Sequence, residues 1–370
     1  MSGFRTLGQR EAVAAARAML LAGIPHAVVL AGPAGVGKTT LALDIAAALM
    51  CTADDPGARP CRACRACRMV EHGNHPDIHR LVPRGPGGAI PIGGKGEGGV
   101  RDLVRDLSLL PVEGGARVAI VEAAQRMTDD AQSAFLKTLE EPPAGTTILL
   151  CADDEDRLLP TIRSRCARIR LGPLGIRDVE AVLVARGDAD APTAARLARI
   201  TGGRPGHAIA YALAPNAAPI RGEITRTLLD LLASGPSARI SGVRDLAGRA
   251  ADLVRELDAD EEGAEVAASS DEPVARIAAS ERRRGALALV AIWRSVLRDL
   301  ALVGRDATAS VRELDLVDDL RAAAARLGGD RPGAFLHELD IAGERLEGNV
   351  SPELVLDVLA LHWTAEARVA

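Results

Sequence analysis

The feature that most constrains this chain is the octapeptide GPAGVGKT at residues 32–39, which matches the phosphate-loop pattern GxxxxGK[ST] at every fixed position. A short apolar segment at 27–31 precedes it, and an apolar pattern with helical spacing follows at 39–50. A strand, a glycine-rich loop and a helix in this order predict an α/β nucleotide-binding fold, in which backbone N–H groups and the helix dipole face phosphate oxygens. The residues expected to bind the nucleotide here are Gly32, Gly35, Gly37, Lys38, Thr39 and Thr40.

Binding a nucleotide and hydrolysing it need different residues. Lys38 is expected to neutralise the β- and γ-phosphates, and Thr39 is expected to bind Mg²⁺. A second apolar strand at 117–121 is followed by Glu122, a carboxylate placed to hold the same ion. The next residue is Ala123, which cannot activate water, so the sequence predicts a nucleotide site without an obvious catalytic base. The alternative for Glu122 is an ordinary surface acid at the end of a strand.

Four of the six cysteines are clustered, with the spacing C-x9-C-x2-C-x2-C. Four thiolates complete the tetrahedral shell of a zinc ion and leave no position for water, so the site is expected to be structural and not catalytic. An iron–sulfur cluster and reduced core cysteines are the alternatives. The predicted zinc ligands are Cys51, Cys61, Cys64 and Cys67.

The sequence leaves alternatives open for the arginines and histidines near this cluster. Three interleaved arginines would offset the charge of a zinc tetrathiolate or face a partner: Arg62, Arg65 and Arg68. His72 and His75 are candidate substitute ligands, although ordinary polar roles are favoured for both. Cys151 and Cys166 lie far from the cluster and are interpreted as buried thiols.

The rest of the sequence predicts an α/β region followed by helices. Strands are expected at 117–121, 146–151 and 167–171, and helices at 9–22, 100–110 and 129–140. Because strands and helices alternate, a mostly parallel sheet is favoured. After Pro173 the patterns are helical, with three short helices in 176–213 and mostly helix over 219–370, including one that begins at Pro352.

Composition sets limits on the class of protein. The chain has 370 residues, enough for two or three domains, and only 2% aromatic residues, so Ala, Leu and Val must fill the core. A net charge of −5 argues against a globally basic DNA-coating protein. Since no long apolar run and no N-terminal apolar signal core is present, a cytoplasmic protein is expected. The glycine-rich residues 84–99 predict a flexible loop, and the acidic stretch 258–272 predicts a solvated one.

Two further motifs give the sequence a family resemblance. LEEPP at 139–143 and TIRSRC at 161–166 follow the phosphate loop and the four-cysteine insert in that order. The combination resembles the bacterial DNA polymerase III clamp-loader subunits, of the AAA+ class, with specific motifs in residues 1–213 and a helical pattern beyond. The resemblance implies an α/β AAA+ P-loop domain at 1–172 with a zinc module inserted at 51–80, a small helical lid domain at 173–218 and an all-α collar domain at 219–370.

Three positions depart from the ATP-hydrolysing motor subunits of that family. Ala123 follows Glu122 where the motor has an acidic pair, the Ala152-Asp153 pair aligns with a polar threonine, and Gly206 aligns with an arginine. The SRC motif at 164–166 is nevertheless retained, a combination that resembles the delta-prime type. By this resemblance, Arg165 is an arginine finger that acts in trans on ATP held by a neighbouring motor subunit. Outside that context, Arg165 would be interpreted as a structural arginine that caps a helix or pairs with an acid.

The same resemblance implies partners and cofactors. The partners are gamma/tau subunits, in three copies, and one delta subunit, in a pentamer that loads the sliding clamp on primed DNA; the cofactors are structural zinc and ATP or ADP with Mg²⁺. Two alternatives stay open. One is a gamma/tau-type motor, in which another acid replaces the missing base. The other is a zinc-dependent nucleic-acid module that uses the arginine-rich cysteine segment.

Overall fold

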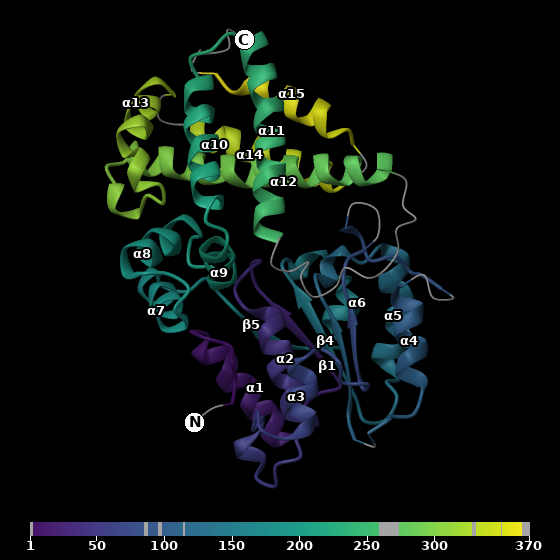
Figure 1. Cartoon of the computed structure of the whole chain (residues 1–370). Helices are drawn as coiled ribbons and strands as arrows, with labels where there is room; N and C mark the ends of the chain where they lie inside the picture. The colour runs from purple at the N-terminus through teal and green to yellow at the C-terminus, as the bar shows by residue number, and fades with distance from the viewer. Residues whose placement is uncertain are drawn as a thin grey trace. The chain divides into compact units, whose positions relative to one another are not determined.

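Figure 1 shows the computed structural model of the chain. It describes residues 3–84, 88–94, 98–113, 115–258, 274–327, 331–348 and 350–364, with the backbone alone at 274–278 and 331. The chain divides into two compact units: Met1–Val182 with Gly203–Gly206, and Leu183–Gly202 with His207–Ala370. The expected division into three domains stays a prediction.

The first unit is built on a five-stranded sheet in the order β2-β3-β4-β1-β5. Every neighbouring pair of strands is parallel, which confirms the predicted sheet. The strands are β1 (Ala27–Ala31), β2 (Ile78–Leu81), β3 (Arg117–Val121), β4 (Thr146–Ala152) and β5 (Ala167–Arg170). Strand β2 was not expected, since residues 51–80 were assigned to the zinc module. It lies at the edge of the sheet and is only partly buried, so its sequence, IHRL, lacks the continuous apolar character of the inner strands.

Each face of the sheet has its own core, because successive residues of a strand point to opposite faces. On β1, Val28 and Leu30 pack on one face with residues of α1 and α2, and Val29 packs on the other with residues of α4 and α5. Figure 1 shows these two pairs of helices on opposite sides of the strands. The helices are α1 (Arg10–Ala22), α2 (Lys38–Met50), α4 (Val100–Ser108) and α5 (Asp129–Glu140). Since both faces are covered, the inner strands are fully buried, as their apolar sequences predict.

Short elements connect the strands and helices of this unit. They are η1 (Pro56–Ala58), α3 (Arg65–Glu71), η3 (Ala124–Arg126), η4 (Glu155–Arg157) and α6 (Pro160–Arg163). Helix α4 ends at Ser108, two residues before the predicted end, because Leu110 precedes Pro111 and the residue before a proline disfavours helical backbone.

Helices make up the second unit, as predicted. The helices from Ile176 onward are α7 (Ile176–Arg186), α8 (Ala191–Ile200), α9 (Pro205–Leu213), α10 (Ala217–Leu231), α11 (Pro236–Asp258), α12 (Val274–Val303), α13 (Val317–Leu327), α14 (Arg331–Glu347) and α15 (Pro352–His362), with single turns η6 (Thr308–Ser310) and η7 (Leu314–Leu316). Trp293, Phe335 and Trp363 form an aromatic cluster in the core of the second unit, with ring centroids 5.0–5.4 Å apart.

Two expected loops are only partly covered by the described residues. Residues 85–87 and 95–97 of the glycine-rich segment, and 259–272 of the acidic segment, lie outside them. Where the glycine-rich segment is described, it is anchored: Ile90 is buried, its N–H donates to the Arg126 carbonyl, and its carbonyl accepts from Thr128 N. The prediction of a flexible loop was therefore wrong at Ile90, because an apolar side chain follows the glycines. Among the described helices, none is both long and apolar enough to cross a membrane.

Candidate nucleotide and metal sites

The phosphate loop joins β1 to the start of α2, as its sequence predicts. Gly32, Gly35 and Gly37 all have positive φ, of 151°, 77° and 100°. At Gly32 there is also no room for a side chain, since a Cβ atom would lie 2.0 Å from the carbonyl oxygen of Leu171. The glycines are therefore required by the backbone path of the loop. Thr40, on the first turn of α2, is exposed, and its role stays a prediction.

Lys38 is buried and held by three acceptors. Its Nζ donates to the carbonyl oxygens of Gly32 and Pro33, both at 2.7 Å, and to Oδ1 of Asp153 at 2.6 Å. Asp153 is fixed in turn by Gln125, which donates to Oδ2 at 3.0 Å and accepts the Asp153 backbone N–H at 3.0 Å. The sequence indicated Lys38 but not this partner, because Asp153 follows a strand 115 residues away along the chain.

Glu122 lies beside Thr39, and their sharing of a metal ion stays a prediction. The Thr39 hydroxyl is 3.4 Å from Oε2 of Glu122. The other oxygen, Oε1, accepts from Nε and Nη2 of Arg80 at 3.0 and 2.6 Å. Arg80 was missed because the strand that carries it, β2, was missed. Ala123 follows in left-handed backbone conformation, with φ 47°, and offers no carboxylate.

Arg165 lies apart from these groups, in the turn between α6 and β5. Its side chain is about one-third exposed. Nη1 donates to the Thr161 carbonyl at 2.9 Å, and Nη2 forms an ion pair with Glu140 at 2.5 Å. Glu140 belongs to the LEEPP motif, so the structure brings the two family motifs together.

The four clustered cysteines converge in the first unit. Their Sγ atoms all lie within 4.8 Å of one another. Around a tetrahedral zinc ion with Zn–S bonds of about 2.3 Å, the sulfurs would be about 3.8 Å apart, so this donor set fits such an ion. The chain makes the cluster by ending α2 just before Cys51 and starting α3 after Cys64, which caps that helix by accepting the N–H of Cys67. His72 and His75 lie outside the group.

Hydrogen bonds to the sulfurs bias two of the thiols toward the thiolate that a metal requires. The pKa of Cys61 is lowered, chiefly by the backbone N–H of Ala63. Burial raises the pKa of Cys64, but hydrogen bonds from Thr52 and Cys67 outweigh it and the pKa falls to about 6. Burial raises the pKa of Cys67 to about 12. Deprotonation of all four thiols therefore requires the charge of a bound cation.

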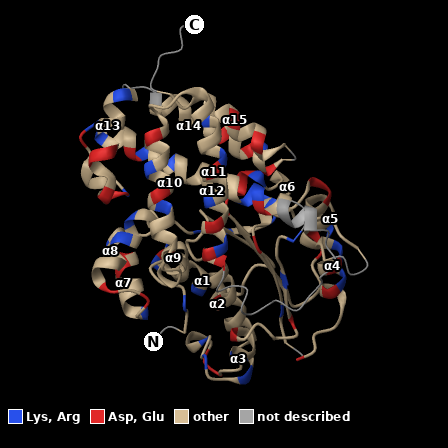
Figure 2. Ribbon diagram, turned by 45° about the horizontal axis from the view of Figure 1, so that its top comes forward, with Lys and Arg blue, Asp and Glu red and all other residues tan. Residues whose placement is uncertain are grey.

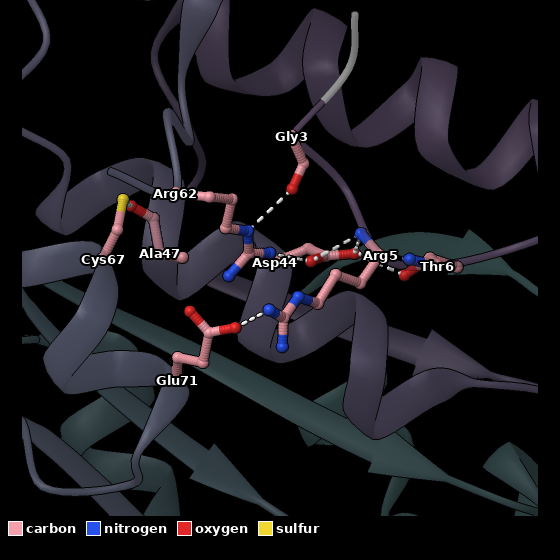
Figure 3. Close-up of polar contacts among 8 residues, drawn as sticks. All are labelled: Gly3, Arg5, Thr6, Asp44, Ala47, Arg62, Cys67 and Glu71. Atoms are coloured by element: carbon pink, nitrogen blue, oxygen red, sulfur yellow. Dashed lines mark hydrogen bonds and ion pairs between the residues drawn. The ribbon is translucent and has the colours of Figure 1, made fainter. Parts of the chain in front are cut away.

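An ion pair anchors the cysteine segment to α2 and to the N-terminal segment (Figure 3). Arg62, between Cys61 and Cys64, pairs with Asp44 of α2 and donates to the Gly3 carbonyl at 2.7 Å. Of the other interleaved arginines, Arg65 pairs with Glu113 and is 72% exposed. Arg62 therefore has an internal role, one that the sequence did not distinguish from those of its neighbours.

The two remaining cysteines differ in burial. Cys151 is buried in β4, and burial raises the pKa of its thiol to about 12. Cys166 is half-buried, and burial raises its pKa to about 11. The prediction of a buried thiol holds for Cys151 and only partly for Cys166, which comes just before the short strand β5.

Comparison with known proteins identifies the relatives of the first unit. Residues 9–175 match the family described as "DNA polymerase III, delta subunit". The chain is 38% identical over 182 residues to DNA polymerase III subunit delta' of Pseudomonas aeruginosa, covering 49% of this chain and 53% of that protein. With subunit delta' of Bacillus subtilis it shares 34% identity over 161 residues, covering 44% and 46%. The family resemblance is thus confirmed over this region.

The motor type is also among the relatives. DNA polymerase III subunit gamma/tau of Mycobacterium tuberculosis is 33% identical over 183 residues, covering 48% of this chain and 30% of that protein. The chain spans about half the length of the delta' relatives it matches. Among solved structures, a DNA polymerase III gamma-subunit-related protein of Thermotoga maritima is similar to this chain with 17% identity and a TM-score of 0.34. The match covers 91% of this chain and 99% of that protein.

Proposed function

From the match of residues 9–175 to the DNA polymerase III delta family, we propose that this chain is a delta-prime-type clamp-loader subunit, which acts in DNA replication without hydrolysing ATP itself. One observation carries the proposal: Ala123 stands beside Glu122, while the SRC motif with Arg165 is retained. A subunit of this kind lacks the base for its own hydrolysis and keeps the residue that serves a neighbour.

A second position argues against a motor role. Gly206 aligns with the arginine that motor subunits direct at bound nucleotide. Its N–H donates to the carbonyl of Gly35 in the phosphate loop at 2.8 Å. A Cβ atom at 206 would lie 3.0 Å from that oxygen, closer than an ordinary van der Waals contact. An arginine at this position would therefore need the loop to shift.

Arg165 is proposed to stabilise the charge that develops on the phosphoryl group of ATP in the adjacent motor subunit. A guanidinium presents several N–H donors in a fixed plane, which suits the equatorial oxygens of a transferring phosphoryl group. The partial exposure of Arg165 and its ion pair with half-exposed Glu140 leave it able to exchange partners. The proposed partners of this chain are gamma/tau and delta subunits, the sliding clamp and primed DNA. Its proposed location is the cytoplasm.

The cofactors proposed for the first unit are structural zinc and a nucleotide. Cys51, Cys61, Cys64 and Cys67 would hold zinc, which would cross-link the C-terminal end of α2 to α3. Thr39 and Glu122 would hold Mg²⁺, and the phosphate loop with Lys38 would bind ATP or ADP.

The test is ATP turnover by the purified chain alone and by a loader reconstituted with gamma/tau, delta, clamp and primed DNA. The chain alone should show no turnover. In the loader, Arg165→Ala should slow hydrolysis at the one site it faces by about 10³-fold or more. If three motor sites work independently, total turnover then falls by roughly one-third, and by more if they work in sequence.

The control is Arg170→Ala, which removes an equally charged but 70% exposed side chain that pairs with Glu155. This variant should leave turnover unchanged. Equal turnover in the wild-type and Arg165→Ala loaders would contradict the finger role. Turnover by the chain alone that Lys38→Ala abolishes would instead identify a gamma/tau-type motor.

The nucleic-acid module is the weaker alternative. Of the arginines in the cysteine segment, Arg62 is paired with buried Asp44 inside the unit and is only 18% exposed, so it is not available to bind phosphates; Arg65 pairs with Glu113 at the surface. Acidic and basic residues are interspersed along the helices drawn in Figure 2, a pattern that does not favour a uniformly basic helix for binding phosphates. Salt-dependent binding of DNA by the isolated chain would favour this alternative.

A further inference from the structure

The lysine of the phosphate loop is paired with a carboxylate from another part of the chain. Lys38 Nζ has three acceptors, of which two are carbonyls of the loop and the third, Asp153, carries a negative charge. In a phosphate loop the lysine supplies the positive charge that offsets the β- and γ-phosphates. Here a carboxylate 2.6 Å from that nitrogen already offsets the charge.

Asp153 is held in this position from two directions. Gln125 donates to its second carboxylate oxygen and accepts its backbone N–H, both at 3.0 Å. Gln125 is itself buried and lies in the turn η3 that follows Glu122. Contacts with Gln125 therefore hold the carboxylate beside Lys38, and turning it away from Lys38 would break the hydrogen bond to Gln125.

The residue expected to bind Mg²⁺ is also paired within the chain, in this case an acid with a basic partner. Glu122, the carboxylate expected to face Mg²⁺, forms a two-nitrogen ion pair with Arg80 through Oε1. Both charged groups that a magnesium nucleotide would need, Lys38 and Glu122, are thus paired within the chain. Of the two partners, Asp153 has the larger consequence, since its negative charge also repels the phosphates.

We propose that Asp153 determines the nucleotide affinity of this chain by competing with the phosphates of the nucleotide for Lys38. The Asp153 carboxylate pairs with the Lys38 ammonium group that the triphosphate requires. The loop therefore keeps its fold and its sequence motif but binds nucleotide weakly. The proposal deepens the nucleotide-site part of the proposed function and rests on it, but it is independent of Arg165 and of the loader.

The test is a calorimetric titration in which MgATP is added to the full chain loaded with zinc. Asp153→Asn removes the charge at nearly constant volume and should lower the Kd for MgATP at least tenfold relative to wild type. Adding Lys38→Ala to that variant should abolish the gain, because the released lysine is what binds the phosphates. Thermal melting of each variant shows whether it is folded. Asp153→Thr also removes the charge, and it is titrated as a second variant because Asn could disturb the contact with Gln125.

The matched control is Asp154→Asn, which removes one negative charge at the adjacent, exposed position and keeps an oxygen able to accept the Asp156 N–H. This variant should bind MgATP as wild type does. The proposal is overturned if folded Asp153→Asn and Asp153→Thr bind no tighter than wild type, or if Asp154→Asn gains as much. Neither result bears on turnover by the loader carrying Arg165, so failure here is distinguishable from failure of the clamp-loader role.

Discussion

Arg62 and Asp44 form an ion pair that joins the cysteine segment to the helix of the phosphate loop. Asp44 is 1% exposed and also accepts the N–H groups of Arg5 and Thr6 and the Thr6 hydroxyl, at 2.7–3.0 Å. Figure 3 shows these groups converging on the one carboxylate. The N-terminal segment, α2 and the cysteine segment therefore share a single buried negative charge, for which Arg62 is the cation.

Removing that cation should destabilise the first unit. Arg62→Ala leaves the Asp44 carboxylate buried with neutral donors only, and breaking a buried pair on one side costs about 3 kcal/mol. Because Arg62 is 18% exposed, water can replace part of the interaction, and we expect a loss of about 2 kcal/mol in the free energy of unfolding, measured by chemical denaturation. Arg65→Ala, at a side chain 72% exposed, should change it by less than about 0.5 kcal/mol. Equal effects of the two variants would show that the pair with Asp44 is not stabilising.

Metal removal should make thiols of the cysteine cluster reactive. In the metal-loaded chain the clustered cysteines are expected to be protected from a colorimetric thiol reagent. Cys151 should react very slowly, since a pKa of about 12 leaves roughly 10⁻⁴ of the thiol ionised at pH 8. A chelator should then make Cys61 and Cys64 reactive, since the pKa of each thiol is lowered, whereas Cys67 should stay slow because burial raises its pKa to about 12. The melting temperature should fall at the same time.

The matched variants for this site are Cys64→Ser and Cys166→Ser. The first removes one ligand and should lower metal content and melting temperature together. The second removes a half-buried thiol outside the cluster and should leave metal content unchanged. Wild-type protein that is free of metal and melts at the same temperature with and without zinc would remove the structural role.

Sequence patterns predicted the parts of this protein that depend on neighbouring residues. The inner strands were found because burial on both faces makes them continuous apolar runs, and the cysteine cluster because its ligand spacing is short. Strand β2 was missed because an edge strand has no such run. The charge pairs of the phosphate loop could not be predicted, since Lys38 and Asp153 are 115 residues apart, and Arg80 and Glu122 are 42 apart. Only the order of the strands in the sheet brings them together.

The aromatic cluster of the second unit should be a major source of its stability. Trp363 is 1% exposed, packs edge-on to Trp293 at 5.3 Å, and donates its indole N–H to the Leu228 carbonyl at 2.7 Å. Trp363→Ala should lower the free energy of unfolding by about 3–5 kcal/mol, through lost burial and the cavity left behind. Leu354→Ala, at a side chain 64% exposed on the preceding helix, should cost less than about 0.5 kcal/mol. A small effect of Trp363→Ala in denaturation followed by fluorescence and circular dichroism would contradict this account.

Burial lowers the pKa of His75 below its usual 6.5, although the carboxylates of Asp77 and Glu113 favour the charged form. The nearby Arg65 opposes that form, and the Asp77 N–H donates to Nδ1 at 3.2 Å, which requires that nitrogen to be unprotonated. As the pH falls through 6.5, the unfolded chain binds the proton before the folded chain does, so the contribution of His75 to stability is complete above that pH and is lost below it. The free energy of unfolding, measured in excess zinc from pH 7.5 to 5.5, should therefore fall less steeply for His75→Gln than for wild type. His72→Gln, at an exposed histidine three residues away, should follow the wild-type slope, and identical slopes for all three proteins would exclude His75 as a source of the pH dependence.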